Sequence, residues 1–273
     1  MSDDLARERA VARELARHAG RLALSLQSTG LAVDRKHGDE PVTEADRRAS
    51  ALIVEALRLA FPEDAILSEE APDDRERLVR RRVWMIDPID GTRDFIRGED
   101  GYSTMIGLLI GTEPTLGVVY QPRGDRLYHA VRGHGAFLTA NGEEHVLRVS
   151  TVGKSEAMRM VASKSHRDET ITEVRNVLGI SDEQNVGSVG LKLGLIARGD
   201  RDLYVNPQGH SKRWDTLGPE AILHEAGGKL TDARGRNIDY RAEELANLDG
   251  LIASNGLLHS EIVTKIGPLL TRR

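Results

Sequence analysis

Apolar residues recur every three or four positions in the first part of the chain, which is the spacing of one face of an α-helix. Between residues 2 and 28 this face consists of Leu5, Ala12, Leu15, Ala19, Leu22 and Leu26. A second helix is predicted from Thr43 to about Ala60, and Phe61-Pro62 ends it. Two amphipathic helices therefore open the chain.

The pattern changes to short apolar runs after residue 64. Runs at 65–68 and 83–86 read as strands, and five more follow at 104–111, 116–122, 126–131, 136–139 and 145–149. Gly, Pro, Asn or Asp separate these runs, as expected for tight turns, and Gly-His-Gly at 133–135 is one such turn. We expect an antiparallel meander over residues 104–149.

Strands and helices alternate in the remaining part of the chain. Strands are predicted at 160–163, 202–206, 229–232 and 250–254, and helices at 168–179, 189–199, 215–228 and 256–270. Alternation of this kind is typical of an α/β fold. We predict an α/β protein with an N-terminal α+β subdomain, residues 1–150, that carries the antiparallel sheet, and a C-terminal α/β subdomain, residues 151–273.

The composition limits the classes of protein. The 273 residues are 39% hydrophobic and 30% charged, with a net charge of −5 and no cysteine. This composition indicates a globular protein, and the absence of cysteine excludes disulfides and thiolate metal sites. Because the net charge is negative, no broad attraction to nucleic-acid polymers or membranes is expected. The first 15 residues lack the apolar region of a signal peptide, and no run reaches the ~18 apolar residues of a membrane span. The expected location is the cytoplasm.

The segment Asp87-Pro88-Ile89-Asp90-Gly91-Thr92 places two acids three residues apart at the end of a predicted strand. Pro88 favours departure from the strand in a tight turn, and Gly91 permits a backbone that a Cβ would block. If a helix begins near Thr92, the amides of Gly91, Thr92 and Arg93 form an anion site beside two carboxylates. Carboxylates with phosphate oxygens suit Mg²⁺. An Asp-rich turn that caps a helix is the alternative.

Other acidic residues could join this pair, although spacing alone cannot show convergence. Glu69-Glu70 follows the strand 65–68, where an acidic surface loop is the alternative. Asp215 is expected to be the N-cap of a helix, and Asp46 forms a capping box with Thr43. Two carboxylates ~5 Å apart repel by roughly 3 kcal/mol at an effective dielectric constant of ~20. A cluster of them needs a cation, a proton or strong donors.

Four motifs in this order resemble the inositol monophosphatase-like superfamily of magnesium-dependent, lithium-sensitive phosphatases. They are VTEADR, SEE, WMIDPIDGTRDF and WDTLGPEAILHEAGG, and the similarity spans about Val42 to Asp232. The resemblance implies a layered αβαβα sandwich, a homodimer, and two or three Mg²⁺ ions with Mn²⁺ as a substitute. It implies metal ligation by Glu69, Asp87, the carbonyl of Ile89, Asp90 and Asp215.

The resemblance also implies catalytic and substrate-binding roles. Asp46 and Thr92 would orient and deprotonate the attacking water, with Glu70 beside the metal ligands. The amides of Gly91 and Thr92 would hold the scissile phosphate. The small phosphorylated substrate would contact Gly91, Thr92, Arg93, His166, Lys192 and Asp215.

Three segments are closest to the 3′(2′),5′-bisphosphate nucleotidases of this superfamily. ASKSHRD (162–168), GSVGLKLGLIARGDRDLY (187–204) and GTRDF resemble nucleotidase motifs. A second phosphate needs a cation, and the candidates are Lys164, His166, Lys192, Lys212 and Arg213. For Lys212-Arg213 a solvated turn is the alternative, and His166 could cap a helix. A buried Lys192 would need an anion.

The sequence therefore favours hydrolysis of adenosine 3′,5′-bisphosphate to AMP and phosphate by a metal-activated water. Ser188-Val189-Gly190 and Asn206 depart from the nucleotidase pattern, because many nucleotidases carry arginine at the latter position. Inositol monophosphatase and histidinol phosphatase activities stay open. A catalytically inactive regulator that binds sugar phosphates is the alternative of another class, although the acidic set is complete.

Overall fold

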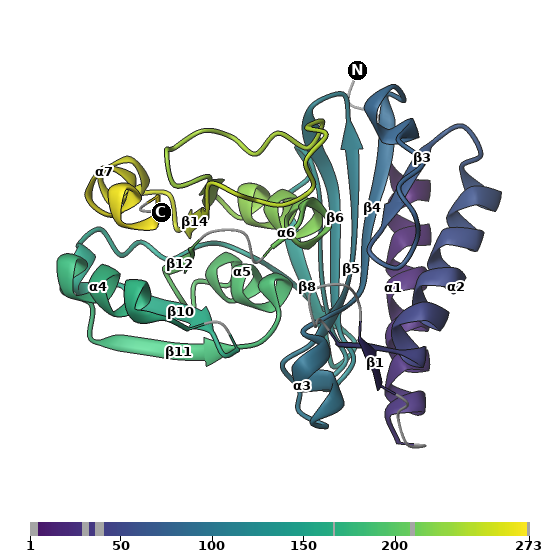
Figure 1. Ribbon diagram of the computed structural model, residues 1–273, viewed down its shortest axis with the longest axis horizontal. Coiled ribbons are helices and arrows are strands. Elements are labelled where there is room, and N and C mark those ends of the chain that lie inside the picture. Colours follow the sequence, from purple (N-terminus) through teal and green to yellow (C-terminus); the bar gives the residue numbers. More distant parts are fainter. Residues whose placement is uncertain (1–4, 29–32, 36–40, 166, 208–210, 272–273) are drawn as a thin grey trace.

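The computed structural model describes residues 5–28, 33–35, 41–165, 167–207 and 211–271. Two sheets and three pairs of helices form five layers, in the order αβαβα (Figure 1). The predicted layered sandwich is confirmed. Because each sheet is covered by helices on both faces, most of the strand residues near the centre are buried.

The larger sheet has seven strands in the order β3-β4-β5-β6-β7-β8-β9. Their bounds are β3 Ala65–Ser68, β4 Arg82–Asp90, β5 Ser103–Ile110, β6 Glu113–Gln121, β7 Arg126–Val131, β8 Ala136–Ala140 and β9 Glu143–Val146. Strand β3 pairs in parallel with β4, and every other pair is antiparallel. The predicted meander is confirmed, except that residues 147–149 lie beyond the last strand.

Strand β4 is longer than the predicted run at 83–86. It continues through Pro88 to Asp90, and its pairing with β5 shifts register between Asp87 and Asp90. A proline is compatible with this position because the ladder is already irregular there. The helix predicted near Thr92 is α3 (Thr92–Ile96), with Gly91 before it. The acidic motif therefore spans the end of a strand and a short helix.

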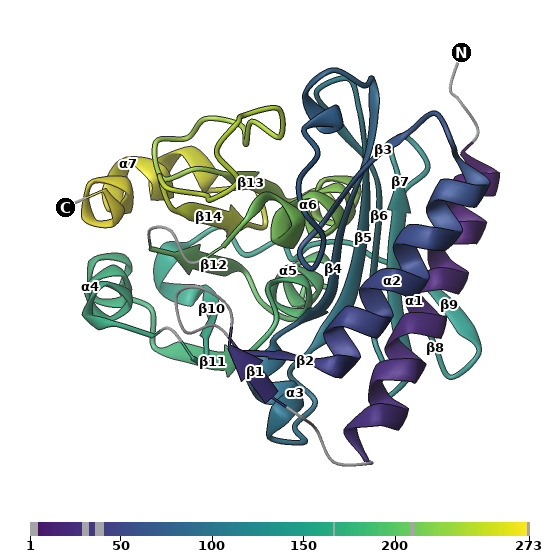
Figure 2. The same ribbon diagram turned by 45° about the vertical axis from the view of Figure 1, so that its right-hand side comes forward.

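Helices α1 (Ala6–Gln27) and α2 (Glu44–Ala60) cover one face of the larger sheet (Figure 2). Their apolar faces pack on strand residues such as Trp84 and Ile106. The predicted capping box is present, because Thr43 accepts from the amide of Asp46 while the Asp46 carboxylate accepts from the amide of Thr43 at 2.8 Å. A two-stranded ribbon, β1 (Val33–Arg35) with β2 (Pro41–Thr43), leads into α2.

Helices α5 (Val189–Ala197) and α6 (Arg213–Glu225) lie between the two sheets. Helix α6 approaches the larger sheet closely because three glycines meet there. A Cβ on Gly117 would lie 2.0 Å from the carbonyl oxygen of Gly218, and one on Gly107 would lie 2.6 Å from the Gly218 nitrogen. This contact brings the beginning of α6 next to β4, where the acidic motif lies.

The smaller sheet has the order β11-β10-β12-β14-β13. Its strands are β10 Arg159–Ser163, β11 Asp182–Val186, β12 Leu203–Asn206, β13 Lys229–Thr231 and β14 Leu251–Ser254. Helices α4 (Glu169–Leu178) and α7 (His259–Leu270) cover its outer face, and 3₁₀ turns occur at Glu76–Leu78 and Ser155–Ala157. Strand β11 was not predicted, and α7 begins three residues later than expected.

The prediction that Asp215 is an N-cap is wrong. Helix α6 begins at Arg213, so Asp215 is its third residue, and its carboxylate accepts from the amide of Lys212 at 2.8 Å. Lys212 is held outside the helix because it forms an isolated β-bridge with Ala246. The side chain of Asp215 still stabilises the start of the helix, but from inside the first turn.

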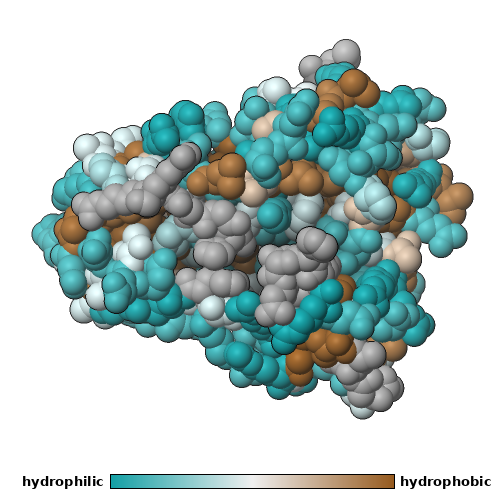
Figure 3. Space-filling model, in the orientation of Figure 1, coloured by the Kyte–Doolittle hydropathy of each residue, from teal (hydrophilic) through white to brown (hydrophobic). Residues whose placement is uncertain are grey.

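The surface face in Figure 3 is mainly hydrophilic, with hydrophobic side chains in small separate groups. Large hydrophobic residues that are exposed, such as Leu59, Val79 and Leu257, come from separate elements of the fold. Within the described part of the chain, no helix is both long and apolar enough to cross a membrane.

Candidate active site

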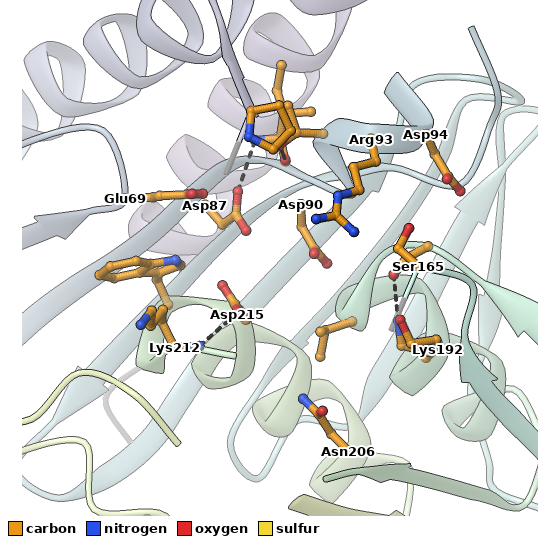
Figure 4. A pocket seen from close by; sticks show the side chains of 18 of the residues that line it. Glu69, Asp87, Asp90, Arg93, Asp94, Ser165, Lys192, Asn206, Lys212 and Asp215 are labelled. Atoms are coloured by element: carbon orange, nitrogen blue, oxygen red, sulfur yellow. Dashed lines mark hydrogen bonds between the residues drawn. The ribbon is translucent and has the colours of Figure 1, made fainter. Parts of the chain in front are cut away.

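Five carboxylates line one pocket between the two sheets, and four of them, from three parts of the chain, are the predicted metal ligands. Glu69 follows β3, Asp87 and Asp90 belong to β4, and Asp215 belongs to α6. Figure 4 shows their side chains around a common space. Lys192 of α5 and Tyr204 and Asn206 of β12 also line this pocket. The structure therefore brings together every side chain that was predicted to bind metal.

Burial and mutual repulsion raise the pKa values of Asp87 and Asp215. The pKa of Asp87 is raised well above its usual value, first by burial and then by the charges of Glu69, Asp90 and Asp215. Burial also raises the pKa of Asp215 well above its usual value, with the charges of Asp90 and Glu69 adding to it. Ionisation of the whole group is unfavourable without a compensating positive charge.

Asp90 differs from its neighbours because several donors surround it. Burial raises its pKa, whereas the charge of Lys192 and hydrogen bonds from Ser188 and Gly190 act in the opposite direction. Its Oδ2 atom accepts from the Ser188 hydroxyl at 2.5 Å and from the Gly190 amide at 3.0 Å. One oxygen of this carboxylate is thus fixed by helix α5.

The donor set fits a hard divalent cation. Carboxylate and carbonyl oxygens are the ligands that Mg²⁺ takes, and an ion would offset the repulsion that raises these pKa values. Among the residues that the structure describes, no three acidic or histidine side chains stand in an arrangement that would enclose an ion without adjustment. Binding of a metal would therefore require the carboxylates to move from the positions that they have here.

Asp46 and Thr92 approach each other as predicted. The Thr92 hydroxyl lies 3.5 Å from Oδ1 of Asp46 and donates to the carbonyl of Ile89 at 3.0 Å. Asp46 is buried, and its Oδ2 atom accepts from the Thr43 hydroxyl at 2.6 Å. Gly91 has φ 94°, and a Cβ there would lie 2.5 Å from the carbonyl oxygen of Gly101. Only glycine fits this turn.

The predicted cations are divided between the pocket and its surroundings. Arg93 and Lys212 line the pocket, whereas the Arg213 guanidinium hydrogen-bonds Asn247 elsewhere. Lys164 is paired with Glu99. His166 lies outside the described residues. Glu70 is half-buried and does not line the pocket.

Lys192 is fully buried, and its amino group binds the main chain. Nζ donates to the carbonyl oxygens of Gly187 at 2.5 Å and Val186 at 3.2 Å, and it lies 5.2 Å from the centre of the Tyr204 ring. Burial lowers the pKa of Lys192 to about 8, against the opposing effect of Asp90 and other acids. The negative charge that a buried lysine needs is thus supplied at longer range by the acidic residues of the pocket.

Asp94 is a pocket residue that sequence reasoning missed. It is 2% exposed, and its Oδ1 atom has no hydrogen-bond partner within the part of the chain that the structure describes. Gly101 and Gly187 leave space for its side chain. A Cβ on Gly101 would lie 2.0 Å from Oδ2 of Asp94, and a Cβ on Gly187 would lie 2.5 Å from the same atom. Nothing local in the segment GTRDF distinguishes this buried acid from a solvated helical one.

The comparisons with known proteins agree with this architecture. A sequence model of the inositol monophosphatase family matches residues 4–268. A 3′(2′),5′-bisphosphate nucleotidase, CysQ, of Salmonella typhimurium is 35% identical over 235 residues, which are 85% of this chain and 93% of the relative. A histidinol-phosphatase of Chlorobaculum parvum is 34% identical over 269 residues, or 94% of this chain and 95% of the relative.

Solved structures give the same result. An IMPase of Thermotoga maritima superposes with a TM-score of 0.81 at 28% identity and covers 97% of both chains. The extragenic suppressor protein suhB of Bartonella henselae also reaches 0.81, at 26% identity, over 94% of this chain and 97% of that one. Fold and pocket thus define a phosphate-ester hydrolase. The chain belongs to the inositol monophosphatase family, and it is a phosphatase.

Proposed function

We propose that this phosphatase is a Mg²⁺-dependent 3′(2′),5′-bisphosphate nucleotidase that converts adenosine 3′,5′-bisphosphate to AMP and phosphate. One observation carries the proposal: the pocket that gathers the four carboxylates predicted to bind metal also takes in Arg93 and Lys192. The carboxylates suit a metal at the scissile phosphate, and the cations suit a second anionic group of the substrate. The 35% identity to the Salmonella nucleotidase supports the same substrate.

Glu69, Asp87, Asp90, Asp215 and the carbonyl of Ile89 would hold the metal, as two or three ions. Bound Mg²⁺ would polarise the phosphate and lower the pKa of the attacking water. Mn²⁺, which also prefers oxygen ligands, would substitute for it. Inhibition by lithium is expected if one of the ions is weakly held, and titration with LiCl would test it.

The protein groups around Thr92 would handle the attacking water. The Thr92 hydroxyl donates its proton to the Ile89 carbonyl, so its lone pairs are free to accept a hydrogen bond from water. For the transfer, the hydroxyl would turn its proton from Ile89 to Oδ1 of Asp46, 3.5 Å away. Thr92 would then take a proton from the water while its own proton passes to the Asp46 carboxylate. The amides of Gly91 and Thr92 would bind the phosphate oxygens and stabilise the charge that develops on them.

The second phosphate of the substrate would lie against Arg93. Arg93 is an exposed side chain on α3, and Figure 4 shows it between Asp90 and Asp94 on the side of the pocket that holds Ser165 and Lys192. A guanidinium binds phosphate with two parallel hydrogen bonds. Lys192 would contribute through its charge, because its amino group already donates to Val186 and Gly187.

Histidinol phosphate is the second candidate substrate. Asp94 favours it, because a buried carboxylate with one unpartnered oxygen, within the described structure, complements a cationic amine better than a phosphate. The match to the Chlorobaculum histidinol-phosphatase over 94% of this chain supports this alternative. Arg93 and Asp94, adjacent in sequence, therefore favour phosphorylated substrates whose second charged group is negative in one case and positive in the other.

A substrate panel tests the proposal. Phosphate release with Mg²⁺ should be compared by kcat/KM for adenosine 3′,5′-bisphosphate, inositol 1-phosphate, fructose 1,6-bisphosphate and histidinol phosphate. We expect the nucleotide to be preferred. Equal values for all four would indicate a generalist, and preference for histidinol phosphate would transfer the assignment to the second candidate.

Replacement of Arg93 by methionine should raise KM for adenosine 3′,5′-bisphosphate about 10- to 100-fold, because a charge-assisted hydrogen bond contributes about 1.5–3 kcal/mol. KM for a substrate with a single phosphate should change much less. Arg97→Met is the matched control, since Arg97 is an exposed arginine four residues away that does not line the pocket. Steady-state kinetics of both variants would measure this, and equal effects on the two substrates would contradict contact with a second phosphate.

A further inference from the structure

The carboxylate of Asp90 is held by residues from the distant part of the chain. Its Oδ2 atom accepts from the hydroxyl of Ser188, 98 positions away, and from the amide of Gly190. Ser188 immediately precedes helix α5 and Gly190 lies in its first turn, while Asp90 ends strand β4. A predicted metal ligand on the larger sheet is therefore oriented by a helix that packs between the sheets.

The hydroxyl of Ser188 has a defined set of partners. It donates its one proton to Asp90, so it must accept from the Ser103 hydroxyl at 2.8 Å and from the Leu191 amide at 3.1 Å. One donated and two accepted hydrogen bonds satisfy a serine hydroxyl completely. Both serines are 0% exposed. Rotation of the hydroxyl away from Asp90 would leave buried polar atoms unpaired, so its orientation is fixed.

The main chain around Ser188 is fixed as well. The Ser188 amide donates to the Gly101 carbonyl at 2.9 Å, and Lys192 binds the carbonyls of the two residues before Ser188. Gly190 has no room for a side chain, because a Cβ would lie 2.5 Å from Sδ of Met105. Helix α5 therefore cannot slide along the sheet without breaking the contacts to Asp90.

We propose that Ser188 is a positioning residue, which fixes one oxygen of Asp90 so that the other is directed toward the metal. The inference depends on the proposed function only in taking Asp90 as a metal ligand. A partner that orients a metal ligand commonly contributes 10–100-fold to metal affinity or activity. Ser188 would thus tune the metal centre without touching metal or substrate.

Binding of Mn²⁺ to the metal-stripped full-length protein, followed by electron paramagnetic resonance without substrate, tests this role. Ser188→Ala should weaken Mn²⁺ binding about 10- to 100-fold. Ser188→Thr, which retains the hydroxyl, should restore binding close to that of the wild type. Asp168→Ala is the matched control, because Asp168 caps helix α4 by accepting from the Ile171 amide. It should lower the melting temperature comparably and leave Mn²⁺ binding unchanged.

The outcomes distinguish failure of the positioning role of Ser188 from failure of the metal assignment of Asp90. If Ser188→Ala binds Mn²⁺ like the wild type and only loses stability, Ser188 is a helix cap and the proposal is overturned. Failure of a folded Ser188→Thr variant to bind better than Ser188→Ala would also overturn it. Asp90→Asn should bind Mn²⁺ more weakly than the wild type. Unchanged binding by that variant would remove Asp90 as a ligand and with it the metal assignment of the proposed function.

Discussion

Replacement of Asp90 by asparagine should lower turnover with Mg²⁺ by at least about 10³-fold while the protein stays folded, which is the scale of removing a group central to catalysis. Asparagine has the same shape, and its carbonyl can still accept from Ser188 and Gly190, which now bind Oδ2. It removes the negative charge that a metal requires. Burial already raises the pKa of Asp90 in the metal-free protein, so a neutral side chain costs the fold little.

Asp100→Asn provides the matched control for this experiment. Asp100 is an exposed acid ten residues further along the chain, and it does not line the pocket. Phosphate release and thermal denaturation, each with and without Mg²⁺, would be measured for both variants. Mg²⁺ should raise the melting temperature of the wild type and of Asp100→Asn, because a ligand of the native state stabilises it. Near-normal turnover by Asp90→Asn would refute the metal assignment.

Features governed by neighbouring residues could be predicted from the sequence. The start of α2 follows from the reciprocal hydrogen bonds of Thr43 and Asp46, which lie three residues apart. The meander follows from alternation and turn residues, and its strands pair with their neighbours in sequence. The position of the acidic motif at the end of a strand follows from the apolar run before it and from the Pro and Gly within it. Each of these signals acts over a few residues.

Features that depend on distant contacts could not be predicted. Strand β11 reads Asp-Glu-Gln-Asn-Val and lies at the edge of its sheet, where exposure removes the apolar alternation that identifies a strand. Helix α6 begins before Asp215 because Lys212 pairs with Ala246. The contact of Ser188 with Asp90 also requires the completed fold, since the two are 98 residues apart.

The second large expected effect is a loss of stability on replacement of Asp202. It is 0% exposed, and it accepts from the Arg159 amide at 2.7 Å, from Nε of Arg159 at 2.9 Å and from the Ser150 hydroxyl. Burial alone would raise the pKa of Asp202, but the hydrogen bonds from Arg159 and Ser150 outweigh it and lower the pKa below 3.8. Folding thus favours the ionised form of Asp202. Its carboxylate, just before β12, links that strand to Arg159 of β10 and to Ser150 in the segment before β10.

Asp202→Ala should lower the free energy of unfolding at pH 7 by about 2–3 kcal/mol. Loss of one partner of a fully buried ion pair costs about 3–5 kcal/mol. Solvent screens part of this interaction here, because the Arg159 side chain is 34% exposed. Since folding lowers the pKa, the contribution of Asp202 is complete above the unfolded value of 3.8 and is lost as the pH falls through the folded value. The difference between variant and wild type should therefore narrow below about pH 4.

Urea denaturation at pH 7 and at about pH 3.5 would measure both parts of this prediction. Asp200→Ala is the control, because Asp200 pairs with Arg198 at the surface and is 42% exposed. Such a pair contributes at most about 1 kcal/mol. Equal losses for the two variants at pH 7 would show that Asp202 is not a special link between strands. A difference from the wild type that stays constant at the lower pH would show that its charge is not what stabilises the fold.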